Sequence, residues 1–255
     1  MELVRTATAA GVTTVTLDSP ANRNALSTPL MRELLAALAG ALTDPAVRVV
    51  VLSHTGPVFC SGADLKETAA ARADGRVPAE MLADVLAAIW EFPKPVLARI
   101  AGPARAGGLG LIAAADLAVC TRDATFAFSE VRLGVIPAVI SATVLPRLQA
   151  RAAAELYLTG DGFNGIRAAE IGLVTAAVPS DRLDATVAGY CDSLVRGGPQ
   201  ALAGTKQLLR RRPRDTVRAD LADLSATSAG YFRSAEGREG VAAFREKRPA
   251  NWIPQ

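Results

Sequence analysis

A strand pattern opens the chain at Leu3–Arg5, and polar and apolar residues then alternate over Gly11–Leu17. Alternation with a period of two is typical of strands that have one buried face. The turn residues Asp18-Ser19-Pro20 follow the second run. The pattern therefore predicts a β-hairpin that ends before residue 18.

The hydrophobic period then changes. Leucines at 30, 34, 38 and 42 fall on one helical face, Thr28 can cap that helix, and Pro29 suits its first turn. The predicted helix ends near Asp44-Pro45. The next apolar run, Val49–Leu52, is short and rich in β-branched residues, which predicts a strand buried on both faces.

Up to about residue 140, the remaining pattern again predicts strands that alternate with helices. Helical tendency over residues 66–92 is interrupted near 74–78, and a glycine-rich loop at 102–110 leads into a helix of about eight residues. Most segments from Ser141 onward are helical. Further strands are predicted at 95–100, 117–120, 125–128 and 174–178. The sequence thus predicts an α/β fold of repeated strand-strand-helix units followed by a helical C-terminal part.

Composition narrows the class of protein. The chain has 255 residues, of which 50% are hydrophobic and 21% charged, so we expect a compact globular protein rather than a disordered one. No run approaches the roughly 20 apolar residues that a membrane span requires, and Met1–Arg5 contains no basic segment followed by an apolar stretch. We therefore expect a cytoplasmic protein that does not enter membranes.

Cysteine and histidine usage point away from disulfides and metals. The three cysteines, Cys60, Cys120 and Cys191, form no CxxC pair and no even set, which indicates reduced thiols. His54 is the only histidine, so no zinc ligand set is available and no metal site is predicted. His54 follows the strand predicted at 49–52, and we expect it to be a surface loop residue.

The net charge of +3 is concentrated toward the C-terminus, where Arg210-Arg211-Arg212-Pro213-Arg214 forms a basic run. This run could bind a polyanion. It follows an apolar stretch and contains the proline that typically ends a helix, and no aromatic residue is interleaved for base stacking. We favour a helix end and expect no nucleic-acid partner.

Two glycine-bearing loops follow predicted buried strands, at Ser61–Asp64 and at Gly107–Gly110. The second formally matches the GxGxxA dinucleotide fingerprint, but the next strand begins at Leu117, too soon for the long helix of a Rossmann unit. Such loops can present backbone N–H groups, and two of them could converge on one oxygen atom as an oxyanion hole. The alternative is that both are tight turns whose small residues only solve packing problems.

Several ordered motifs together resemble the enoyl-CoA hydratase/isomerase (crotonase) superfamily across the whole chain. They are Pro20-x-Asn22-Arg23-Asn24-Ala25-Leu26, Phe59–Leu65, Ala106-Gly107-Gly108, Ser129–Gly134, Ala168–Val174 and Phe244–Arg248. The resemblance implies a spiral of ββα units over residues 1–195 and a helical trimerisation region over residues 196–255, assembled as a homotrimer or homohexamer. It also implies an acyl-CoA thioester as substrate and no separate cofactor, since coenzyme A is part of that substrate.

The resemblance also implies roles for particular residues. The backbone N–H groups of Ala63 and Gly107 would hold the thioester carbonyl oxygen, and Glu130 would transfer the proton. A carboxylate in an apolar pocket suits acid–base work near neutral pH because burial raises its pKa. Cys60 has no histidine partner at a family position, so we interpret it as a packing residue. The residues implied to contact coenzyme A are Arg23, Ala63, Leu65, Lys66, Phe244 and Lys247, the last two reaching a neighbouring subunit.

Two departures from the family pattern affect the activity expected. Two-glutamate hydratases of the family carry a carboxylate where this chain has Gly110, and Ala138-Val139-Ile140-Ser141 replaces a glycine-rich stretch. The combination resembles a bacterial subgroup of hydratases, some acting on branched or dicarboxylic enoyl-CoAs, for which Arg105 or Arg132 could pair with a second carboxylate. We predict an enoyl-CoA hydratase. A Δ3,Δ2-enoyl-CoA isomerase with one glutamate and a non-catalytic acyl-CoA-binding homologue remain alternatives, and acyl selectivity is expected within residues 67–92.

Overall fold

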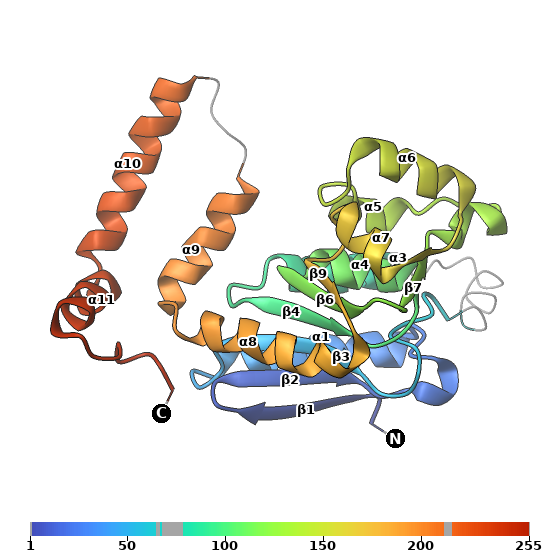
Figure 1. Cartoon of the computed structure of the whole chain (residues 1–255), viewed down its shortest axis with the longest axis horizontal. Coiled ribbons are helices and arrows are strands. Elements are labelled where there is room, and N and C mark those ends of the chain that lie inside the picture. Colours follow the sequence, from blue (N-terminus) through green and yellow to red (C-terminus); the bar gives the residue numbers. More distant parts are fainter. Residues whose placement is uncertain (1, 65–66, 68–78, 212–215, 255) are drawn as a thin grey trace.

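A computed structural model describes residues 2–64, 67, 79–211 and 216–254, and the elements named below lie in this part of the chain (Figure 1). Its centre is a twisted six-stranded sheet in the order β1-β2-β3-β4-β6-β9. The first two strands pair antiparallel and the others pair parallel. The strands are β1 (Val4–Ala9), β2 (Val12–Leu17), β3 (Val49–His54), β4 (Val96–Ile100), β6 (Leu117–Thr121) and β9 (Ala176–Val178).

The predicted hairpin and the predicted central strand are confirmed. In β1 and β2, Val4 pairs with Leu17 and Ala9 with Val12, and side chains of β2 alternate between buried and half-buried. Every residue of β3 is buried. The strand extends two residues beyond the predicted 49–52 and includes His54, so the expectation of a surface histidine is wrong.

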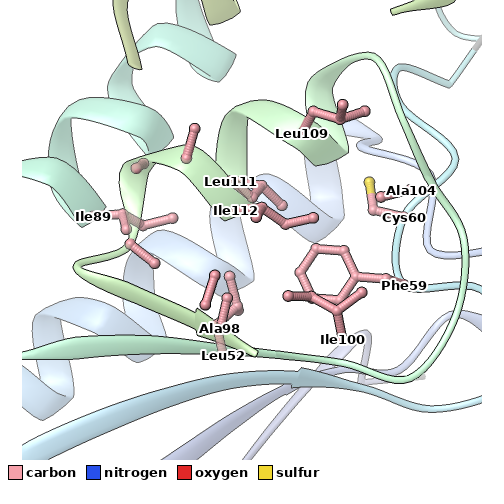
Figure 2. Packing of buried hydrophobic residues seen from close by; sticks show 14 of the residues in the cluster. Leu52, Phe59, Cys60, Ile89, Ala98, Ile100, Ala104, Leu109, Leu111 and Ile112 are labelled. Carbon is pink, nitrogen blue, oxygen red and sulfur yellow. The ribbon is translucent and has the colours of Figure 1, made fainter. Parts of the chain in front are cut away.

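Helices α1 (Thr28–Thr43), α3 (Ala79–Trp90), α4 (Gly107–Ala114) and α5 (Ala138–Val144) pack on one side of the sheet. Figure 2 shows Leu111 and Ile112 of α4 directed toward Phe59 and Ile100 in this core. The N-cap of α1 is Ser27 rather than Thr28, because the Ser27 hydroxyl accepts the Leu30 N–H.

The other face of the sheet is covered by α8 (Leu183–Val195). A second apolar cluster joins this helix to the strands through Val49, Val51, Leu97, Val119, Leu183, Val187 and Cys191. Layers on both faces explain why the central strand has no exposed residue.

A small three-stranded sheet connects the core to the candidate site. It contains β5 (Ala104–Arg105), β7 (Thr125–Ala127) and β8 (Phe163–Asn164), in that order. The 3-10 helix η2 (Ser129–Leu133) begins one residue beyond the end of β7. Helix α6 (Ala150–Thr159) packs against η2, and α7 (Gly165–Glu170) packs against β7 and β8. Short 3-10 helices η1 (Pro20–Asn22) and η3 (Ser180–Arg182) complete the connections.

The C-terminal part is helical, as predicted, with α9 (Pro199–Arg210), α10 (Val217–Arg233) and α11 (Ala235–Glu246). Figure 1 shows α10 and α11 lying well away from the sheet, on the side opposite α6 and α7. The predicted helix end at Arg210 is confirmed. The division at residues 195 and 196 stays an interpretation, and it falls between α8 and α9.

A largely buried ionic cluster attaches α9 to the core. The Asp116 carboxylate pairs with Lys206 at 2.6 Å and with Arg210 at 2.5 Å, and it also accepts the Val96 N–H. The guanidinium of Arg210 lies over the Trp90 ring, 4.6 Å from its centroid. The basic residue at the helix end thus serves to attach the C-terminal helices.

No helix in the described ranges is long and apolar enough to cross a membrane.

Candidate active site

The site is built around the loop that follows β3. Asn24 is fully buried beside this loop, and its side-chain amide donates to the carbonyl oxygens of Thr55 (3.0 Å) and Val58 (2.8 Å). Its side-chain oxygen accepts the Ser19 N–H. The Asn24 side chain therefore fixes the turn at residues 55–58 from inside the protein.

Gly62 brings this loop against the loop that precedes α4. Its φ of +91° lies in the region that favours glycine. A Cβ at Gly62 would stand 2.9 Å from the Cβ of Ala106, 3.1 Å from the Arg105 carbonyl oxygen and 3.6 Å from the Gly107 nitrogen. The backbones on either side of Ala63 and Gly107 are thus in direct contact, as the oxyanion-hole hypothesis requires.

Both candidate amides are available to a ligand. Gly107 begins α4, where the first N–H groups have no intrahelical acceptor, and Ala106 precedes it with a φ of +48°. In the described ranges, no hydrogen bond uses the N–H of Ala63 or that of Gly107. Two unengaged donors on adjacent loops can hold one oxygen atom that carries negative charge.

Apolar side chains surround the start of α4. Leu26 and Leu82 are the nearest side chains to the position that a Cβ on Gly107 would take, at 2.7 and 3.5 Å. A low-polarity wall strengthens the interaction between an amide and an anionic oxygen. Leu82 lies in the 67–92 stretch that the sequence analysis associated with the acyl group, of which 68–78 fall outside the described residues.

Glu130 is the candidate acid–base group. The Ala106 N–H donates to the Ala127 carbonyl oxygen at 3.4 Å, so η2 continues from a strand that runs beside the Gly107 loop. One carboxylate oxygen of Glu130 is buried without a hydrogen-bond partner in the described part. Burial raises the pKa of Glu130 above its ordinary value, and its own backbone N–H opposes that shift in part. Such a carboxylate is a stronger base than an exposed one.

Gly110 faces an apolar wall. A Cβ on Gly110 would lie 2.7 Å from the Cγ2 atom of Ile140 and 3.2 Å from a methyl group of Leu86. The side chain that replaces the family's glycine-rich segment therefore fills the space beside Gly110. Sequence reasoning did not find this pairing, because 30 positions separate the two residues and no local pattern links them.

Two hydroxyl groups near Glu130 were also missed. The Ser141 hydroxyl bonds to the Pro137 carbonyl oxygen at 2.6 Å and lies 3.4 Å from the Tyr157 hydroxyl. Burial raises the pKa of Tyr157, and the charge of Glu130 contributes in the same direction. The Tyr157 ring packs at a tilt of 44° against Phe128, two residues before Glu130. The signal in the sequence was only the unusual segment at 138–141.

The residues implied to contact coenzyme A are not gathered in one place. Arg23 is exposed beside the loop, and its carbonyl oxygen accepts the Ser61 N–H. Leu65 and Lys66 lie outside the described residues. Phe244, with 86% of its surface exposed, and Lys247 belong to the end of α11, on the opposite side of the molecule from α6 and η2 (Figure 1). Within one chain these two do not join the other site residues.

Cys60 and the two arginines considered for a second carboxylate have structural contacts. Burial raises the pKa of the Cys60 thiol to about 12, which supports its interpretation as a packing residue. Arg105 donates to the carbonyl oxygen and hydroxyl of Thr125. Arg132 pairs with Asp161. Both arginines therefore already have partners within this chain.

Comparison with known proteins shows what this chain is similar to in sequence and fold. Residues 7–255 match the family described as enoyl-CoA hydratase/isomerase. A solved enoyl-CoA hydratase from Mycobacterium avium is 46% identical, with a TM-score of 0.74 over 98% of both chains. One from Mycobacterium smegmatis is 34% identical, with a TM-score of 0.89 over 98% of both chains. The 2,3-dehydroadipyl-CoA hydratase of Escherichia coli is 30% identical over 92% of each chain.

Proposed function

This chain belongs to the enoyl-CoA hydratase/isomerase family, and we propose that it is a hydratase that adds water across the 2,3 double bond of an enoyl-CoA thioester. The observation that carries the proposal is the contact between the Gly62–Ala63 and Ala106–Gly107 backbones. It leaves the amides of Ala63 and Gly107 unengaged, and Ala106 is hydrogen-bonded to Ala127, three residues before Glu130, whose pKa is raised by burial.

In the proposed reaction, the amides of Ala63 and Gly107 hold the thioester carbonyl oxygen. Glu130 takes a proton from water as the water oxygen bonds to C3, and the double-bond electrons move to form an enolate. Glu130 then returns the proton to C2, which restores the thioester and the carboxylate. Each preorganised donor lowers the barrier by roughly 3 kcal/mol, because the charge on the oxygen is larger in the enolate than in the substrate.

Binding of the coenzyme A part is proposed to involve two chains. Arg23, Leu65 and Lys66 would lie along it in one subunit, and Phe244 and Lys247 would come from a neighbour in a homotrimer or homohexamer. The exposed apolar side chains of the C-terminal helices support a second copy as their cover: Leu208, Leu209, Leu221, Tyr231, Phe232, Val241 and Phe244. The absence of a spanning helix from the described part is compatible with the cytoplasmic location we propose.

The acyl group is proposed to be branched or dicarboxylic. One relative is named for dehydroadipyl-CoA, the thioester of a dicarboxylic acid. A distal carboxylate would share Arg105 with Thr125 or Arg132 with Asp161, through the remaining N–H groups of the guanidinium.

The packing of Ile140 against Gly110 favours a second candidate, a Δ3,Δ2-enoyl-CoA isomerase. With no carboxylate at position 110, Glu130 alone would take a proton from C2 and deliver it to C4 of the same enolate. Hydration and isomerisation share the oxyanion hole and differ in whether water is held beside C3.

The deciding measurement follows the absorbance of the conjugated thioester with a panel of enoyl-CoAs, straight, branched and dicarboxylic. A hydratase removes the absorbance of a 2-enoyl-CoA, whereas an isomerase creates it from a 3-enoyl-CoA. Glu130→Gln should abolish either activity, and Glu155→Gln, a change at an exposed glutamate of α6, is the control. Tight binding of acyl-CoAs without turnover of any of them would instead indicate a non-catalytic binding protein.

A further inference from the structure

His54 occupies the point where the two loops of the site leave the sheet. It is the last residue of β3, which continues into the loop that carries Ala63. Ala101 follows β4, which continues into the loop that carries Gly107. The Ala101 N–H donates to Nε2 of His54 at 3.1 Å. One side chain therefore connects the starting points of both loops.

The hydrogen bond fixes the state of the imidazole. Because Nε2 accepts a hydrogen bond, it carries no hydrogen itself, and in the neutral ring the hydrogen is on Nδ1. Nδ1 is buried and has no hydrogen-bond partner among the described residues. The backbone carbonyls of Thr55, Gly56 and Val58 lie close enough to the ring to act toward a higher pKa, and those of Thr55 and Val58 already accept the Asn24 amide.

Further contacts continue the connection from His54 toward the two amides. The ring of His54 packs edge-on against Phe59, with centroids 5.5 Å apart. The Phe59 N–H donates to the Pro103 carbonyl oxygen at 2.9 Å, and the Arg105 N–H to the Cys60 carbonyl oxygen at 3.0 Å. The loops are thus paired from the sheet to Gly62, and His54 stands at the first step of this pairing.

An imidazole with one buried, unpaired nitrogen lowers the stability of the folded state. A buried donor without a partner destabilises the folded state, and an apolar residue would avoid that destabilisation. Packing alone therefore does not account for a histidine at this position. An acceptor for the Ala101 N–H does account for it, because this bond ties the exposed residue that follows β4 to the buried end of β3.

We propose that His54 is a positioning residue for the proposed reaction: its imidazole holds the loop bearing Ala63 and the loop bearing Gly107 at the separation that a single oxyanion requires. This inference rests on the proposed function. The role is exerted through the backbone of both loops, and His54 itself does not touch the substrate.

Three variants of the full chain test the proposal. In His54→Gln, the side-chain oxygen can accept the Ala101 N–H, whereas His54→Leu has similar size and no acceptor. Val51→Ala is the matched control, since Val51 belongs to the same strand and packs toward α8 on the other face of the sheet. If His54→Leu does not fold, His54→Asn, whose shorter amide does not reach Ala101, replaces it.

Two measurements are made on each variant well below its melting temperature. Steady-state kinetics on the best wild-type substrate should show kcat lowered at least about tenfold in His54→Leu, with KM changed less than about twofold, because misplaced donors weaken the transition state more than substrate binding. Amide hydrogen exchange should rise in both segments 58–64 and 101–107. His54→Gln should restore kcat and protection, and Val51→Ala should lower the melting temperature only.

The outcomes separate this inference from the function itself. Wild-type kcat with unchanged exchange in His54→Leu would overturn the positioning role, as would equal losses in His54→Gln and His54→Leu. If the wild-type protein turns over no enoyl-CoA, the proposed function fails. The exchange comparison then still decides, without any substrate, whether His54 holds the two loops together.

Discussion

The Cγ2 methyl of Ile140 lies 2.7 Å from the point where a β-carbon on Gly110 would stand. The two residues come from α4 and α5, and their closeness leaves no room for any side chain at position 110. A single-carboxylate site is therefore a property of the packing between two helices as well as of one residue.

The first prediction concerns this pair. Gly110→Ala should cost about 1–3 kcal/mol of unfolding free energy, because the new methyl group overpacks the interface. In the double variant Gly110→Ala, Ile140→Ala, the loss should be smaller than the sum of the single losses by about 0.5–3 kcal/mol. Denaturant unfolding of the four proteins measures this coupling, and additive losses would contradict the steric account.

Gly62 offers a test of the contact between the two loops. Gly62→Ala should lower kcat at least about tenfold, because the methyl group collides with Ala106 and its φ of +91° disfavours alanine. Gly40→Ala in α1 is the control, since no atom lies within 4 Å of its new methyl group. That change should stabilise the protein by about 0.5–1 kcal/mol and leave kcat unchanged.

Glu130 should show opposite effects of pH on activity and on stability. Burial raises its pKa in the folded state above the 4.5 of the unfolded chain, so the folded state binds the proton more tightly. The stability that this group contributes is full below pH 4.5 and is lost as the pH rises through the folded value. Activity needs the ionised base and should increase over the same interval.

The Glu130→Gln variant isolates this effect. Its unfolding free energy should exceed that of the wild-type protein by a margin that grows as the pH rises above 4.5, while turnover is lost. Melting temperatures of both proteins across the pH range provide the measurement. A margin that shrinks with rising pH would show that the carboxylate is not desolvated.

His54 predicts a loss of stability in acid. Burial, and to a smaller extent the nearby charge of Arg99, lower its pKa below 6.5, so the unfolded chain takes up the proton first. Stability from this residue is present above pH 6.5 and is lost as the pH falls toward the folded value. The wild-type protein should lose stability relative to His54→Gln between about pH 7 and pH 5, as measured by denaturant unfolding.

The ionic cluster at Asp116 predicts how firmly the C-terminal helices are attached. Asp116→Asn leaves Lys206 and Arg210 without a counter-charge and should cost about 2–4 kcal/mol, somewhat less than a fully buried pair because both arginine and aspartate are slightly exposed. Exchange of amides in α9 should increase. Asp161→Asn, which removes an exposed pair with Arg132, should cost under about 1 kcal/mol.

Long periodic segments of the fold were predictable from sequence, and short ones were not. The hairpin and β3 followed from a period of two and from an unbroken β-branched run. β5 and β8 contain two residues each, too few to carry a period, and they form only because β7 lies between them. Leu42, on the predicted leucine stripe, lies near the end of α1 and is 45% exposed.

For the site, the sequence indicated which loops could present amides but not what holds them together. The glycines at 62 and 107 marked close backbone approach. His54 was misassigned because hydrophobicity ends at Leu52, whereas the strand continues through two buried polar residues. The hydrogen bond from Ala101 that makes this burial tolerable joins positions 47 residues apart.

The proposed oxyanion hole consists of main-chain groups, and this limits how the activity can change by mutation. Among amino-acid substitutions, only a change to proline removes a backbone N–H. Other changes of side chain at Ala63 would therefore leave its hydrogen-bond donor in place. Mutations that alter the chemistry must therefore act on Glu130 or on the contacts that align the two loops. Replacing the Ala63 amide by an ester through chemical protein synthesis would remove the donor alone, which ordinary mutagenesis cannot do.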